Sequence, residues 1–147
     1  LGAIGSAWFA IYAAANGQYL VTSLALLAAG ALLGFLPFNF PKASSFLGDA
    51  GSHLVGYLLA LLAILPQFYD YADPNRLSIL TPLFILAVPL GDMVCVVLIR
   101  WRLGKPFYVG DNNHLSHRLV RRGLSKPTAV LYILLLAAVV GALPCLL

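Results

Sequence analysis

An aspartate beside two glycines is the first segment whose residue types could do chemistry. Asp49 follows Gly48 and precedes Gly51 and Ser52, where a polar stretch meets an apolar run. Glycine lets the backbone turn sharply and leaves space for a ligand to approach the carboxylate. Such a carboxylate suits a hard cation, because magnesium typically takes one or two carboxylates together with substrate phosphates. The alternative is that Asp49 or Ser52 serves only as the N-cap of a helix.

A run of histidines and arginines is the second such segment. Its residues are spaced i, i+3, i+4 and i+7, so in a helix they would form one stripe: His114, His117, Arg118 and Arg121. We expect this helix to be capped by Asp111 or Asn112 and to end at Gly123, with Leu115 and Leu119 resting on the rest of the protein. Two imidazoles and two guanidiniums near a helix start are suited to phosphate. The alternative is an amphipathic helix whose basic face meets anionic lipid headgroups.

The composition indicates what positions these segments. The 147-residue chain is 61% hydrophobic and 10% charged, whereas soluble domains are about 45–50% apolar and about 25% charged. Five apolar segments approach the roughly 20 residues that cross a bilayer as a helix, at about residues 2–15, 19–36, 52–65, 79–99 and 128–147. The sequence therefore predicts an all-α, polytopic integral membrane protein, a bundle of about five transmembrane helices.

The basic residues predict the orientation of this bundle. Seven of the nine Lys and Arg lie between Arg100 and Lys126, and the positive-inside rule places that loop, about 100–126, in the cytoplasm. Alternation places the loop of about 37–51 on the same side and the connection of about 67–76 outside. Because the basic residues lie next to membrane helices, the net charge of +4 does not predict nucleic-acid binding.

Two further features concern packing. Asp92 lies in the fourth segment, roughly 12 Å along a helix from Arg100, and an ionisable group at that depth normally faces the bundle interior or a polar cavity. We favour structural pairing over a functional role for it. The Gly30–Gly34 and Ser52–Gly56 spacings predict close contacts between helices. Both cysteines, Cys95 and Cys145, fall in apolar runs and are expected to be small buried hydrophobes.

The order and separation of the two polar segments resemble one enzyme family. Residues 46–52 match F-x-G-D-x-G-S, a motif of the polyprenyl-phosphate N-acetylhexosamine-1-phosphate transferases, and Asn39-Phe40-Pro41 is similar to the approach to it. Residues 89–92 and 105–119 resemble the last cytoplasmic loop of that family. The spacing is closer to the undecaprenyl-phosphate N-acetylglucosaminyl branch than to the phospho-N-acetylmuramoyl-pentapeptide branch. Three positions depart from the family pattern: Asn112 replaces an Arg, Ser116 replaces a His, and His53 replaces an apolar residue.

The resemblance implies a reaction and its participants. A sugar-1-phosphate would pass from a UDP-N-acetylhexosamine, with UDP-N-acetylglucosamine favoured, to undecaprenyl or another polyprenyl phosphate in the inner (plasma) membrane. UMP would be released, and the product would feed a cell-envelope polysaccharide such as lipopolysaccharide or cell wall. Asp49 would hold Mg²⁺, or Mn²⁺, and would be catalytic together with His114 and His117. Substrate contacts would come from Gly48, Gly51, Ser52, Asp111, Arg118 and Arg121. The resemblance leaves a homodimer open.

The resemblance also implies residues outside this sequence. Family members carry an earlier D-D motif and an N-x-x-N-x-x-D-G-x-D-G-L segment, and neither occurs here. We therefore expect residues 1–147 to be the C-terminal half of a single transmembrane transferase domain, inactive alone. Two other classes stay open. A transporter would bind its substrate near the bilayer midplane, where Asp92 lies, whereas a structural membrane subunit would have no use for Asp49 or the histidines.

Overall fold

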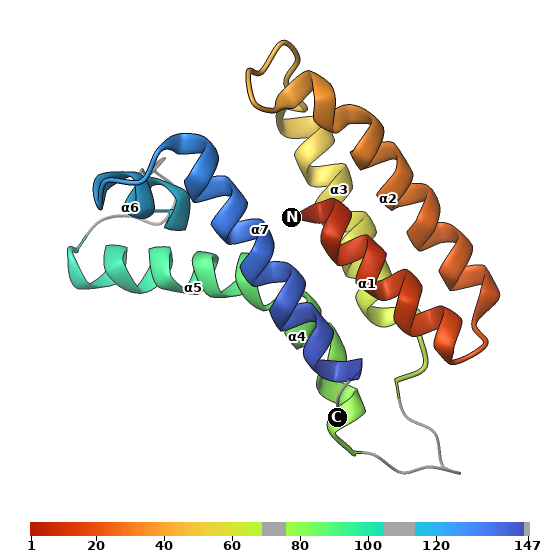
Figure 1. Ribbon diagram of the computed structural model, residues 1–147. Coiled ribbons are helices and arrows are strands. Elements are labelled where there is room, and N and C mark those ends of the chain that lie inside the picture. The colour runs from red at the N-terminus through yellow and green to blue at the C-terminus, as the bar shows by residue number, and fades with distance from the viewer. Residues whose placement is uncertain (69–75, 105–113, 146–147) are drawn as a thin grey trace.

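The computed structural model describes residues 1–68, 76–104 and 114–145. Within these ranges the regular structure is entirely helical (Figure 1). In chain order the elements are α1 (Gly2–Ala15), α2 (Tyr19–Asn39), α3 (Gly48–Ile64), the 3₁₀ helix η1 (Arg76–Leu80), α4 (Thr81–Ile85), α5 (Ala87–Arg102), α6 (Leu115–Arg121), α7 (Lys126–Ala142) and the 3₁₀ helix η2 (Leu143–Cys145).

Helices α1, α2 and α3 run side by side, and α1 packs against the other two (Figure 1). Gly17 makes the tight turn between α1 and α2 with a φ of 68°, a conformation that glycine adopts without steric cost. The side chain of Gln18 then donates to the carbonyl of Gln67 at 3.0 Å and accepts from its N–H at 2.9 Å. This pair of hydrogen bonds joins the α1–α2 turn to the end of α3.

The fourth apolar segment is a bent pair of helices rather than one straight helix. The helical stretch from Ser78 to Ile85 meets α5 at an angle of 66°, and Leu86 between them has a φ of −97° and a ψ of 10°. Pro89 lies in the first turn of α5. Proline has no N–H to donate to the preceding turn and is tolerated at a helix start, so the sequence favours a break just before it.

Helix α7 connects the two halves of the molecule. It contacts α1, α4, α5 and α6, while α5 runs across the direction of the α1–α3 group (Figure 1). The first turn of α7 is capped by Ser125, whose hydroxyl accepts from the Thr128 N–H at 3.3 Å. Helix α6 lies at one corner of the molecule, against the start of α7 (Figure 1).

The structure supports the prediction of an all-helical protein with apolar helices that could cross a membrane, but the part of the chain that it describes does not give five such helices. By length and composition, two helical stretches in the described residues could cross a membrane, Tyr19–Asn39 and Lys126–Cys145, and the bent pair would make a third. Helices α1 and α3 are apolar but shorter. Many large apolar side chains point outward, including Leu20 and Leu27, which are 72% and 71% exposed, as expected for surfaces that face lipid.

Two packing predictions were wrong. A methyl group added at Gly30, Gly34 or Gly56 would have nothing within 4 Å among the described residues, so these spacings do not mark close helix contacts. The tight contact lies between α7 and α1, where a Cβ at Gly141 would come within 2.5 Å of the Trp8 ring. Cys95 and Cys145 are exposed rather than buried, because the apolar runs that carry them turn these positions away from the core.

Candidate functional site

The first candidate group lies at the start of α3. Gly48 has a φ of 66°, in the left-handed region that favours glycine. Leu47 occupies the N-cap position and makes no side-chain cap, so the interpretation of Asp49 or Ser52 as the N-cap was wrong. Asp49 lies in the first helical turn and is exposed. A carboxylate in a first turn is favoured by the helix dipole.

Asp49 leaves its carboxylate open. Its backbone carbonyl accepts from the Ser52 hydroxyl at 3.0 Å and from His53 Nδ1 at 2.6 Å. Within the part of the chain that the structure describes, no hydrogen bond or ion pair engages the carboxylate itself. Its two oxygens are therefore available to an outside ligand. The His53 contact could not be read from the sequence, because this position was noted only as a departure from an apolar pattern.

The loop before α3 fixes where Asp49 lies. The Phe38 carbonyl at the end of α2 accepts from the backbone N–H groups of Ser44 and Ser45 at 2.8 and 3.0 Å, and from the Ser44 hydroxyl at 3.0 Å. The Asn39 side chain donates to the Ser45 carbonyl at 3.2 Å. These bonds fold the loop back onto α2, so the start of α3 is set by local contacts.

Gly51 has a steric role in the same turn. A Cβ at Gly51 would come within 2.6 Å of Leu47 Cγ, so the absence of a side chain lets Leu47 lie against the helix start. Leu47 and Gly51 also line a cavity of about 200 Å³ whose other lining residues belong to α1, α2 and α3. Position 51 therefore requires a glycine so that the Leu47 side chain can pack against the first turn of α3.

The second candidate group lies on α6, whose start differs from the prediction. The N-cap is His114, in an extended conformation with a φ of −56° and a ψ of 153°, so the expected cap at Asp111 or Asn112 was wrong. Both of those residues lie outside the described residues. The predicted end is confirmed: Gly123 has a φ of 98°, its N–H bonds to Val120, and the Leu124 N–H bonds to Leu119, as in a Schellman motif.

The predicted stripe is only partly present. His114 precedes the helix, so His117, Arg118 and Arg121 form the helical part; His117 and Arg121 are exposed and Arg118 is half-buried. The opposite side of α6 holds it in place. As expected, Leu115 and Leu119 pack against a buried cluster, Val88, Ile133 and Ala137. The short helix is therefore anchored by leucines and presents its polar side chains outward.

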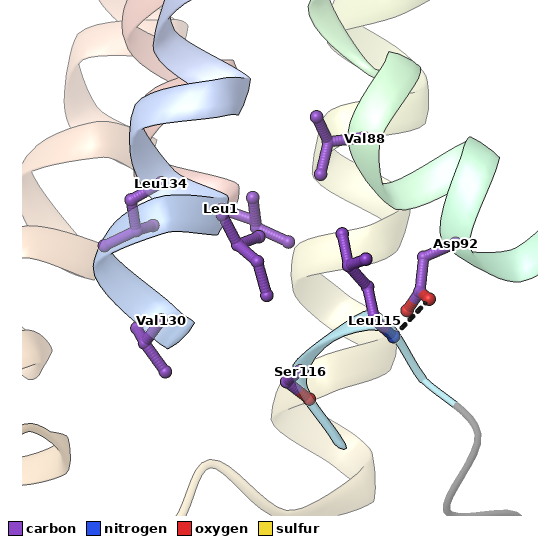
Figure 2. A pocket seen from close by; sticks show the side chains of 8 residues that line it. Leu1, Val88, Asp92, Leu115, Ser116, Val130 and Leu134 are labelled. Carbon is purple, nitrogen blue, oxygen red and sulfur yellow. Dashed lines mark hydrogen bonds between the residues drawn. The ribbon is translucent and has the colours of Figure 1, made fainter. Parts of the chain in front are cut away.

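Asp92 connects α5 to the start of α6. Its Oδ1 accepts from the Leu115 N–H at 2.6 Å, and its Oδ2 lies 2.9 Å from His114 Nδ1. Figure 2 shows the carboxylate aimed at the first residue of α6. Asp92 also lines a cavity of about 220 Å³ together with Leu115 and Ser116. The sequence indicated an interior partner for Asp92, but it did not indicate that this partner belongs to the histidine segment.

The two candidate groups occupy separate places. Gly51 lines the cavity between α1, α2 and α3, and Ser52 lines another along α3. Arg118 instead lines one cavity with α5 and α7 and a second with α5. Figure 1 shows the α2–α3 loop and α6 at different corners of the molecule. The described residues thus present two half-sites, one carboxylate and one imidazole–guanidinium group, without a direct contact between Asp49 and His114.

The residues at the start of α3 suit a magnesium ion shared with a substrate better than a metal ion whose ligands all come from the protein. No group of three His, Cys, Asp or Glu that could hold a metal occurs among residues 1–68, 76–104 and 114–145. Magnesium does not need such a group, because it keeps several waters and shares one or two carboxylates with substrate phosphates. The open carboxylate of Asp49 matches that donor set.

Comparison with known proteins identifies the family. Residues 1–67 match glycosyl transferase family 4. A probable undecaprenyl-phosphate N-acetylglucosaminyl 1-phosphate transferase of Bacillus subtilis is 36% identical over 136 residues, 92% of this chain and 37% of that protein. A decaprenyl-phosphate N-acetylglucosaminephosphotransferase of Mycobacterium tuberculosis is 35% identical over 126 residues, 80% of this chain and 31% of that protein.

A third relative, an undecaprenyl-phosphate alpha-N-acetylglucosaminyl 1-phosphate transferase of Haemophilus influenzae, is 36% identical over 104 residues, 71% of this chain and 28% of that protein. The chain thus spans about a third of the length of the curated relatives it matches. No solved structure matches it. The apolar helices and these matches agree with the resemblance of the two polar segments, and the chain is a membrane protein that belongs to glycosyl transferase family 4.

Proposed function

We propose that the protein transfers N-acetylglucosamine-1-phosphate from UDP-N-acetylglucosamine to undecaprenyl or another polyprenyl phosphate at the cytoplasmic face of the inner membrane. A phosphate oxygen of the lipid attacks the sugar-bound phosphorus, the bond between the two phosphates of the donor breaks, and UMP leaves. The names of the relatives support this reaction. The observation that carries it is the open carboxylate of Asp49 at the mouth of an apolar helix.

The reaction brings anions together, so its main physical demand is charge neutralisation. Asp49 would hold magnesium, which when bound supplies positive charge to the donor diphosphate. The exposed His117 and Arg121, with the half-buried Arg118, offer N–H donors suited to phosphate oxygens. Gly48 leaves open space, with no atom of the described residues within 4 Å of where a Cβ would lie, and so lets a substrate approach the backbone beside Asp49.

The remaining predicted contacts have less direct roles in the proposed site. The Ser52 hydroxyl donates to the Asp49 carbonyl, so it supports the first turn of α3 and can still accept from a substrate through its lone pairs. Gly51 keeps Leu47 in place. Asp111 lies outside the described residues and stays a predicted substrate contact.

The activity requires more than the described half-sites. The relatives are about three times as long as this chain, and the acidic motifs of the family do not occur in it. We therefore propose that residues 1–147 alone are inactive and that the acceptor-positioning carboxylate lies elsewhere in the intact protein. Turnover by the 147-residue chain would contradict this part of the proposal.

The test measures transfer of radiolabelled sugar phosphate from UDP-N-acetylglucosamine to undecaprenyl phosphate by the intact protein, with and without magnesium. Asp49→Asn is the test variant. Tyr19→Phe, at the opposite end of α2 from the α2–α3 loop (Figure 1), is the control that should keep full activity, because this side chain is exposed. Magnesium-dependent transfer lost only in Asp49→Asn supports the reaction and the role of Asp49. Absence of transfer across several UDP-sugars would favour a transporter or a structural membrane subunit.

A further inference from the structure

The carboxylate of Asp92 serves two donors from consecutive residues. Its Oδ1 is bound to the Leu115 N–H at 2.6 Å and its Oδ2 to His114 Nδ1 at 2.9 Å. An ionised carboxylate only accepts hydrogen bonds, so this contact requires a proton on Nδ1. The other ring nitrogen of His114, Nε2, is then the one left for an outside ligand. In the neutral ring Nε2 is an acceptor, and in the charged ring it is a donor.

Burial separates the two members of the pair. The side chain of Asp92 is 22% exposed, whereas that of His114 is 50% exposed. Val88, on the same helix, and Leu115 line both cavities that Asp92 borders, and Arg118 lines one of them. Figure 2 shows Leu115 beside the carboxylate. Hydrogen bonds shielded in this way are electrostatically stronger than in water. Asp92, the less exposed partner, therefore holds one edge of the His114 ring, and the other edge is exposed.

A purely structural cap would not need this arrangement. One carboxylate oxygen suffices to satisfy the first N–H of α6, and it comes from a different helix. The second oxygen goes to the side chain of a residue that the sequence already assigned to the site. Nucleophilic and acid–base sites commonly orient an imidazole through one nitrogen so that the other acts on the substrate.

We propose that Asp92 is a positioning residue that holds His114 with Nδ1–H inward, so that Nε2 is the nitrogen that faces the substrate and can take up a proton there. This inference rests on the proposed transferase function. Asp92 touches no reacting atom in this proposal; it acts through His114, fixing both the position of the ring and which nitrogen carries the proton. The bend before α5 contributes, because it sets the direction in which α5 presents Asp92 to the start of α6.

The variant Asp92→Asn separates positioning from capping. The asparagine side chain has a single oxygen, and its amide nitrogen only donates. We expect the oxygen to stay with Leu115, because a backbone N–H cannot change its donor role, whereas the imidazole can move its proton to Nε2. The cap of α6 is kept, and the tautomer of His114 is reversed.

The expected loss is about 10- to 100-fold in kcat, the usual effect of removing a partner that orients a functional histidine, with the KM for the UDP-sugar changed by less than about twofold because uniform binding is retained. The assay uses the intact protein. A double-mutant cycle adds His114→Ala and the double variant. If Asp92 acts through His114, Asp92→Asn has no further effect in the His114→Ala background. An equal loss in both backgrounds would overturn the proposal.

A second measurement does not depend on activity. Nitrogen-15 NMR of histidine-labelled intact protein, with the His114 signal assigned by its loss in His114→Ala, reports which nitrogen is protonated. We expect Nδ1–H in the unmodified protein and Nε2–H in Asp92→Asn. An unchanged tautomer overturns the role of Asp92. If the unmodified protein transfers no sugar phosphate, the proposed function fails, and the NMR comparison alone still decides whether Asp92 orients His114.

Discussion

The starts of α3 and α6 hold their polar side chains in contrasting ways. At α3 the Asp49 side chain is exposed, and within the described residues only its backbone carbonyl is hydrogen-bonded. At α6 the imidazole of His114 is tied to a carboxylate that reaches across from α5. A carboxylate that shares a metal with a substrate must be left open, whereas an imidazole that acts through one nitrogen must be oriented. The difference therefore matches the two roles proposed for them.

The two starts also differ in what builds them. The α3 start is fixed by bonds between neighbours in the sequence, from Phe38 to Ser45. The α6 start depends on Asp92, which precedes His114 by 22 residues, and on leucines packed against α5 and α7. Damage to packing in the second half of the molecule should thus disturb the histidine group and leave the Asp49 group in place.

The largest expected effect separates activity from stability at Asp49. We expect Asp49→Ala to reduce sugar-phosphate transfer by roughly a hundredfold or more, the scale of losing one electrostatic contact to the developing charge. The free energy of unfolding should fall by less than about 1 kcal/mol, because only a favourable interaction with the helix dipole is lost. Transfer kinetics and thermal unfolding in detergent measure the two quantities. A large loss of stability would mean that the carboxylate has a structural partner.

At Asp92, in contrast to Asp49, a loss of stability is expected as well as a loss of activity. Asp92→Ala removes the acceptor of both the Leu115 N–H and the His114 ring, and a half-buried donor left without a partner costs about 1–3 kcal/mol. Thermal unfolding should show this loss, and Asp92→Asn should show less of it because the cap is kept. If Asp92→Ala were as stable as the unmodified protein, the contrast between the two helix starts would be wrong.

A third prediction concerns the shape of the α3 start. In Gly51→Ala the new methyl group forces Leu47 to move, and we expect a misplacement of Asp49 that lowers kcat roughly tenfold. The double variant Leu47→Ala/Gly51→Ala should restore most of the activity, because the conflicting side chain is gone. Gly56→Ala, on the same helix with open space around its Cβ, is the matched control. No rescue by Leu47→Ala would show that the conflict is not with Leu47.

The sequence predicted the parts that depend on local or compositional patterns. Apolar runs predicted helices, and Gly123 marked a helix end that the structure confirms. The motif around Asp49 was likewise visible as a contiguous string. The bend before α5 was not predicted although Pro89 favours a helix start there, because the apolar run from Ile79 to Ile99 continues across the break. The start of α6 was not predicted because its cap comes from a distant helix.

Packing glycines could not be assigned from spacing for a related reason. Gly30 and Gly34 have the spacing of a helix-packing motif but face open space among the described residues, whereas Gly141, which has the same spacing from Ala137, meets Trp8 of α1. Spacing specifies which residues share a face of a helix. It does not specify which face the neighbouring helix covers, and that depends on how α7 crosses the bundle.

The smallest expected effects compare a glycine at the start of α3 with a glycine at the end of α6. Gly48 and Gly123 both have positive φ, 66° and 98°, and a Cβ at either would meet nothing within 4 Å in the part of the chain that the structure describes. Alanine at each position should therefore destabilise the protein by a similar amount, about 1 kcal/mol, from backbone strain alone. Only Gly48→Ala should also lower transfer, because Gly48 adjoins Asp49, whereas Gly123 lies at the far end of α6 from His114. Thermal unfolding and kinetics on the pair test this; equal losses of transfer would mean that the end of α6 also positions the site.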